Sequence, residues 1–211
     1  MRPPKSHTGA HGAKQPMSLF DHTFDLKELS VSISELLVAT ADGADAAIEN
    51  AVPEVLHLLR EKMRMDVVFV SEFTDGQRVF RFVDRAPDAP ALPVGASNPL
   101  EESYCQRVVD GRLPEMIADA SALPASLGLP ATPFRVGAHI STAIVLSDGS
   151  VYGTLCCFST QPNDQLRQQE LTTLKNCARL VARKVEISRI PADQTGAAGN
   201  AWKDTAPAPG D

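Results

Sequence analysis

Residues 139–160, "HISTAIVLSDGSVYGTLCCFST", give the clearest structural signal in the chain, because two apolar, β-branched runs flank a turn. Ser147-Asp148-Gly149 suits a three-residue connection, a type I turn with Gly149 left-handed and a bulge. That register pairs Leu146 with Ser150. It predicts one face with His139, Ser141, Ala143, Gly153, Leu155 and Cys157, and another with Ile140, Thr142, Ile144, Tyr152, Thr154 and Cys156. A two-residue turn would exchange the partners. Either way both faces are largely apolar, so we expect a central hairpin covered on both sides.

The composition limits the class of protein. The chain has 211 residues, 43% of them hydrophobic, and a net charge of −6. No basic stripe indicates a nucleic-acid surface, and no apolar run approaches the roughly 18 residues of a membrane span. The four cysteines form no C-x-x-C pair, which favours free thiols in a reducing compartment. We therefore expect a soluble cytoplasmic protein that binds neither nucleic acid nor membrane.

The chain divides into a predicted flexible leader (1–24), a single domain (25–190) and a disordered tail (191–211). Within the domain, apolar spacing predicts a helix over 26–37 and a second one after Asp42-Gly43, with a kink or restart at Pro53. Two strands follow, over 65–73 and 77–86. A long helix over 163–190 begins at an Asn163 or Asp164 cap. Its seam packs on the sheet or against the same helix of a second chain; its members are Leu171, Leu174, Ala178, Val181 and Val185.

A short helix and a long loop separate these strands from the hairpin. In "NPLEESYCQRVVDGRLP", residues 98–114, Asn98 fits the N-cap and Pro99 the first helical position. Asp110-Gly111 ends this helix, and "EMIADA" suggests a brief strand. The Pro-rich segment 121–137 is long enough to act as a lid or a binding wall.

In this order the chain resembles a GAF domain over about 44–186. The resemblance rests on "MDVVFVSEF" after a helix, "YCQRVVDGRLP" before a loop, "RVGAHISTAIVLSDGSVYGTLCCFS" and a closing helix. It implies an α+β, PAS-like fold: a central antiparallel sheet of five to six strands, helices on one face, and a pocket under the loop and short helix on the other. Similar GAF domains often precede cyclic-di-nucleotide output domains, and none follows here.

The departures from the family's known binding motifs reduce the number of ligands that the resemblance implies. Bilin-binding relatives carry a Cys-His pair before the "RVGAHIS" strand, and "LPASLGLPATPF" has neither residue. Methionine-sulfoxide-reducing relatives use loop cysteines, whereas residues 110–137 contain none. The charged signature of cyclic-nucleotide-binding relatives is also unmatched. The cofactor therefore stays unknown.

The resemblance and the expected register suggest a set of pocket residues: Tyr104, Cys105, Val108, Phe134, Arg135, His139, Ser141, Leu155 and Cys157. Cys105 with His139 is the one plausible nucleophile and base. Because Cys105 would lie mid-helix, beyond the first turn, we predict a buried apolar wall instead. Arg107 and Arg135 are candidates to hold a carboxylate or phosphate.

Neither catalysis nor a metal site is predicted. A metal on His139 would need two or three converging ligands. Asp119 and Cys157 could converge there, but no spacing motif supports it.

The sequence thus predicts a small-molecule-binding sensory or regulatory GAF domain in signal transduction, acting without an output domain on the same chain. Its expected partners are a small-molecule ligand, a second copy through the terminal helices, and a separate signalling protein. Two alternatives remain open: a thiol-dependent reductase of a small oxidised metabolite that uses Cys105, and a ligand-free dimerisation scaffold.

Overall fold

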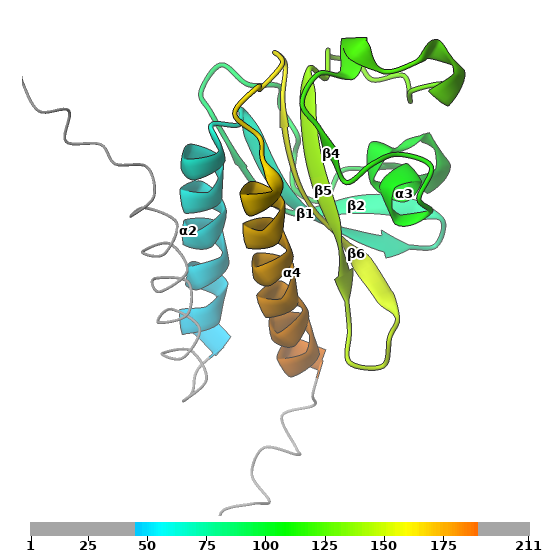
Figure 1. Ribbon diagram of the computed structural model, residues 1–211. Helices are drawn as coiled ribbons and strands as arrows, with labels where there is room; N and C mark the ends of the chain where they lie inside the picture. The colour runs from blue at the N-terminus through cyan, green and yellow to red at the C-terminus, as the bar shows by residue number, and fades with distance from the viewer. Residues whose placement is uncertain (1–44, 190–211) are drawn as a thin grey trace, which may run out of the picture.

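A computed structural model describes residues 45–189 of the chain, with side chains described from Val52 onward. It contains a six-stranded antiparallel sheet in the order β3-β2-β1-β6-β5-β4. Two helices cover one face of the sheet, and α3 with the long loops covers the other (Figure 1). This confirms the predicted α+β fold. The leader, the predicted helix over 26–37 and the tail lie outside the described residues.

The helical layer consists of α2 (Asp45–Met63) and α4 (Gln168–Arg189). α2 runs through Pro53 without a restart. α4 begins later than predicted, because Asn163 forms a turn of its own in which its side chain accepts from the amide of Gln165 at 3.0 Å. The predicted α4 seam packs into the core beneath the sheet, with Val185 only partly buried. Among residues 45–189, no helix has the length and apolar character of a membrane span.

The central strands are β1 (Val67–Thr74), β5 (Ala138–Val145) and β6 (Val151–Ser159). The hairpin of β5 and β6 lies inside the sheet, as predicted, and Leu146 donates to the Ser150 carbonyl at 2.9 Å. The pairing then shifts: Val145 pairs with Val151, but Ile144 pairs with Gly153. One extra residue in β6 therefore forms a bulge, which exchanges the predicted faces.

The observed register corrects the predicted faces of the hairpin. Ser141 pairs with Cys156, and His139 pairs with Phe158. Leu155 and Cys157 instead belong to the core under α2 and α4. The pairing of β1 with β2 (Gln77–Arg85) contains a second register shift, between Val70 and Ser71. Because of this shift, Phe80 and Phe82 lie on opposite faces of the sheet.

The short elements are the two edge strands of the sheet, β3 and β4, and the helix α3 on its other face. β3 (Ser97–Pro99) precedes a 3₁₀ turn and α3 (Tyr104–Val109), and β4 (Met116–Ile117) is the predicted brief strand. The N-cap of α3 is Ser103, whose Oγ accepts from the amide of Gln106 at 3.1 Å. The predicted Asn98 cap was wrong because Asn98 and Pro99 pair with β2. Cys105 consequently lies in the first turn of α3, not in its middle.

Candidate functional site

A small cavity of about 40 Å³ lies between the sheet and its cover of α3 and loops. The strands contribute its floor, and Tyr104 of α3 with loop residues contributes its roof. Its lining is largely aromatic and aliphatic, with two basic side chains; the residues are Phe69, Arg78, Phe80, Leu92, Tyr104, Thr132, Phe134, Val136, His139 and Phe158. Pockets for drug-sized ligands are usually roughly 300–1,000 Å³, so this space admits only a few atoms.

Aromatic side chains fill most of this face. Phe69 meets Phe80 edge to face with 5.1 Å between ring centroids, and Phe134 stacks on Phe158 at 5.1 Å. Tyr104 lies over His139 with 5.2 Å between centroids. The predicted pocket is therefore present beneath the predicted roof, but it is narrow.

Three potential ligand groups meet beside the cavity, and we name Cys105, Cys156 and His139 the sulfur–imidazole cluster. The two sulfur atoms are 3.2 Å apart. Together with a ring nitrogen of His139, they lie within 4.8 Å of one another. Both cysteines are 0% exposed and His139 is 3% exposed. Strand β5, strand β6 and helix α3 each provide one member.

Polar side chains surround the sulfur atoms. Nη1 of Arg78 donates to Sγ of Cys105 at 3.3 Å, and Oγ of Ser141 lies 2.8 Å from Sγ of Cys156. Cys156 also donates to Oγ1 of Thr154 at 3.1 Å. The sulfur pair is thus placed in a polar environment within an otherwise apolar cluster.

Arg78 holds its position through neutral partners. Its Nε and Nη2 donate to Oδ1 of Asn98 at 3.0 and 2.9 Å. Its guanidinium also lies over the rings of Phe69 and Phe80, 5.7 and 4.8 Å from their centroids. This arrangement directs the remaining nitrogen, Nη1, at Cys105.

These surroundings shift the pKa values of the Cys105 and Cys156 thiols in opposite directions. Burial raises the pKa of Cys105, but the Cys156 thiol, the Arg78 cation and the His139 ring together bring it well below its ordinary value. Burial and the neighbouring Cys105 raise the pKa of Cys156 well above its ordinary value. Burial also raises the pKa of Cys157, and that of Cys177 to about 12.

The prediction of Cys105 as an apolar wall was wrong about its surroundings. Sγ of Cys105 lies 3.2 Å from a second thiol and accepts from a guanidinium, and a ring nitrogen of His139 lies within 4.8 Å of it. The partner, Cys156, was missed because the predicted register placed it on the opposite face from His139. The adjacent pair Cys156-Cys157 was the available signal, since one of two neighbours on a strand must face each side.

The other predicted pocket residues divide into three groups. Tyr104, Phe134 and His139 line the cavity, whereas Ser141 contacts the cluster through Cys156. Val108 packs behind Tyr104 in a separate apolar group, and Arg135 is exposed. Leu155 and Cys157 lie on the far face of the sheet, which the bulge explains. Arg78, in contrast, was not predicted.

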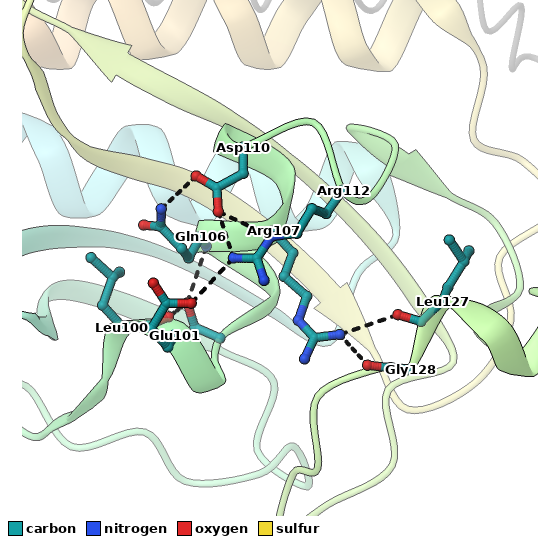
Figure 2. Close-up of polar contacts among 9 residues, drawn as sticks. Leu100, Glu101, Gln106, Arg107, Asp110, Arg112, Leu127 and Gly128 are labelled. Carbon is teal, nitrogen blue, oxygen red and sulfur yellow. Dashed lines mark hydrogen bonds and ion pairs between the residues drawn. The ribbon is translucent and has the colours of Figure 1, made fainter.

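Arg107 fastens the roof and does not face the cavity. Its Nη1 donates to the carbonyl oxygens of Leu127, at 3.2 Å, and Gly128 (Figure 2). The same view shows Arg112 paired with Asp110 at the end of α3 (Figure 2). The sequence had suggested that Arg107 holds a ligand. In the structure it instead connects α3 to the Pro-rich loop.

An antiparallel sheet with helices on one face and a roofed cavity on the other defines the PAS-like class of sensory domain. The family model for the GAF domain matches residues 45–186, and the chain belongs to this family. GAF domains are a general sensory and regulatory fold in signalling. A search of curated proteins finds no match.

Several solved structures share the fold at low sequence identity. A protein described as a GAF sensor from Burkholderia vietnamiensis is 13% identical, with a TM-score of 0.58 over 77% of this chain and 94% of its own. The chromophore-binding domain of a bacteriophytochrome from R. palustris is 17% identical, with a TM-score of 0.55 over 82% and 64%. A free methionine-R-sulfoxide reductase from Neisseria meningitidis is 16% identical, with a TM-score of 0.55 over 87% and 98%.

Proposed function

We propose that this GAF domain is a small-molecule-binding sensory or regulatory module in signal transduction. The supporting observation is His139, which lines the cavity, is 3% exposed and has no hydrogen-bond partner at either ring nitrogen. A buried polar group without a partner costs roughly 1–3 kcal/mol. A ligand in the cavity that bonds to this ring would remove that cost.

The cavity restricts the ligand to a few atoms. A volume of about 40 Å³ excludes a cyclic nucleotide or a bilin while the roof is in place. Arg78 provides a cation and His139 a polar ring, among aromatic walls. These features favour a small anion, a small polar metabolite or an ion over a bulky chromophore.

Thermal-shift screening tests this proposal. A ligand that binds only the native state raises the melting temperature, by an amount that grows with its concentration over Kd. We expect at least one small compound to stabilise the protein, and the exposed cavity residue Thr132 provides a specific variant. Thr132→Phe should abolish the shift, whereas the matched Thr172→Phe on α4 should preserve it. Panels of small metabolites, anions and ions that shift nothing would refute ligand sensing and favour the scaffold.

A thiol-dependent reductase is a second candidate, because Cys105 and Cys156 lie 3.2 Å apart. Reduction of a sulfoxide would convert the two thiols to a disulfide, releasing water and the sulfide, with an external dithiol restoring the pair. Their complete burial and their placement on a helix and a central strand oppose turnover. An assay with free methionine sulfoxide and dithiothreitol decides: turnover lost in Cys105→Ala would establish the reductase.

The assembly and location follow the same proposal. We infer a homodimer through the terminal helices, which signals to a separate protein in the cytoplasm. Ile187, near the end of α4, is 48% exposed and is available for such a contact. All four thiols are free, which fits a reducing compartment. Light-scattering mass should fall to that of a monomer in Ile187→Glu, and a wild-type monomer would contradict the dimer.

A further inference from the structure

The sulfur–imidazole cluster has the composition of a metal site. Two cysteines and one histidine present their donor atoms within 4.8 Å of one another, from three separate elements. Thiolate sulfur and imidazole nitrogen are the ligands of Zn²⁺ and Cu⁺, whereas Mg²⁺ and Ca²⁺ require oxygen. No acidic side chain joins this group among the described residues.

His139 provides an independent sign of a missing partner. Both of its ring nitrogens are buried and unpaired, although the ring lies beside two sulfur atoms. Imidazole is the commonest protein metal ligand in its neutral form. An ion held between this ring and the sulfurs would satisfy a group that no described protein atom satisfies.

We propose that Cys105, Cys156 and His139 bind a thiophilic metal ion, with monovalent copper as the occupant. Metal binding releases the thiol protons, so each cysteine contributes one negative charge. Two sulfurs bound to one three-coordinate ion with bonds of about 2.3 Å lie about 4.0 Å apart in trigonal geometry, so the observed 3.2 Å must open by roughly 0.8 Å. The six-residue helix α3, which carries Cys105, is the element to move.

The charge of the site favours Cu⁺ over Zn²⁺. Two thiolates, neutral His139 and Cu⁺ carry one net negative charge, which the guanidinium of Arg78 neutralises at 3.3 Å from Cys105. The other polar partner of Arg78 is the neutral Asn98. With Zn²⁺ in place of Cu⁺, the two thiolates, His139, the ion and Arg78 together would carry one net positive charge. A net charge in this buried, mainly aromatic setting is costly. Two soft thiolates and one imidazole also suit Cu⁺.

The surrounding polar groups match the outer shell of a metal–thiolate site. Arg78 and Ser141 reach one sulfur each, and such bonds to metal-bound thiolates orient the ligands. The residues that the sequence suggested, Asp119 and Cys157, do not converge on His139. Asp119 bonds to Ser121, and Cys157 lies on the opposite face of the sheet.

This inference rests on the proposed sensing function in one respect: it names the ligand class for the same cavity, whose lining includes His139. A separate measurement distinguishes failure of the copper inference from failure of the sensing proposal. The small-molecule panel is repeated with a chelator present, so that only metal-free binding registers. A hit there with no copper binding would overturn this inference and leave sensing intact.

The direct test is a copper titration of the full chain, reduced and handled without oxygen, against the chromophoric Cu⁺ chelator bicinchoninate. We expect the protein to withdraw one Cu⁺ per chain and to gain ultraviolet absorption from sulfur-to-copper charge transfer. A parallel titration uses Zn²⁺ against 4-(2-pyridylazo)resorcinol. Retention of Zn²⁺ without Cu⁺ would overturn the copper assignment.

Neighbouring residues of β6 provide a matched pair of variants. Cys156→Ala should weaken copper binding by at least about 100-fold, the upper effect of losing an outer-shell partner. Cys157→Ala should bind like wild type, because this equally buried thiol faces α2 and α4. Circular dichroism confirms folding; Cys156→Ser replaces Cys156→Ala, and Cys157→Ser replaces Cys157→Ala, where the alanine variant fails to fold. Equal affinities in the pair, or a Cys105–Cys156 disulfide with no metal uptake by reduced protein, would refute the site.

Discussion

Replacing Gly153 by alanine tests the register that brings Cys156 and His139 to one face. Gly153 pairs with Glu72 on β1 and with Ile144 on β5, beside the bulge. A methyl group at Gly153 would overlap the carbonyl oxygen of Ser71 and lie 2.9 Å from Cα of Glu72. These are backbone atoms, which cannot rotate aside. Strands β1 and β6 would therefore have to separate.

The magnitude follows from two contributions. Overpacking a tight core costs typically about 1–3 kcal/mol, and an immovable backbone neighbour points to the upper end. Separating the strands also strains the buried hydrogen bond between Ser71 and Thr154, 2.9 Å long, whose loss costs about 1 kcal/mol. We expect unfolding free energy to fall by about 3–4 kcal/mol. At roughly 2–4 °C per kcal/mol, the melting temperature would drop by about 10 °C.

Urea denaturation followed by far-ultraviolet circular dichroism measures this loss. Gly149→Ala is the control, because its methyl group meets open space while its φ of +82° gives a separate strain. That strain costs about 1–2 kcal/mol. If Gly153→Ala unfolds within 1 kcal/mol of wild type, the close approach of β1 and β6 does not constrain the register, and our reasoning is wrong.

Three further predictions concern single side chains. Burial raises the pKa of Cys177 to about 12, so iodoacetamide at pH 8 should leave it unmodified in native protein and alkylate it in urea; mass spectrometry reads both. The Ser121 hydroxyl and amide lower the pKa of Asp119 in the folded protein. The Asp119 carboxylate therefore stabilises the fold at pH values above its ordinary pKa of about 4. This stabilisation is lost as the pH falls through the lower pKa of the folded state. Asp119→Asn should therefore weaken the acid dependence of stability, and an unchanged acid-unfolding curve would contradict this. Arg107→Ala should speed amide hydrogen exchange in the loop around Gly128, and Arg112→Ala should not.

Much of the fold could be predicted because local chemistry and tertiary packing agree. The Asp148-Gly149 turn, the two-sided apolar hairpin and the α4 seam each occupy the predicted place. Faces along the strands could not be predicted reliably. The bulge beside Ile144 adjoins Gly153, where β6 closely approaches β1, and such a tertiary contact has no local sequence signature.

The site was only partly predictable for the same reason. Tyr104, Phe134 and His139 were placed at the cavity, because the order of elements was sufficient to locate them. The pairing of Cys105 with Cys156 joins residues 51 positions apart and requires the exact register. Arg78 was missed because a surface arginine and one directed at a thiol look alike in the sequence. The predicted Asn98 cap of α3 was wrong because Asn98 belongs to β3 and pairs with β2, where its side chain accepts from Arg78.

Strand β6 has a property that follows from its two neighbouring cysteines. Cys156 faces the cavity side, while Leu155 and Cys157 are fixed among the side chains beneath α2 and α4. A rigid strand cannot shift one row of side chains without shifting the other. Any occupant that displaces the backbone at Cys156 must therefore change the packing beneath α2 and α4, so the strand itself would transmit the event from one face of the sheet to the helices on the other.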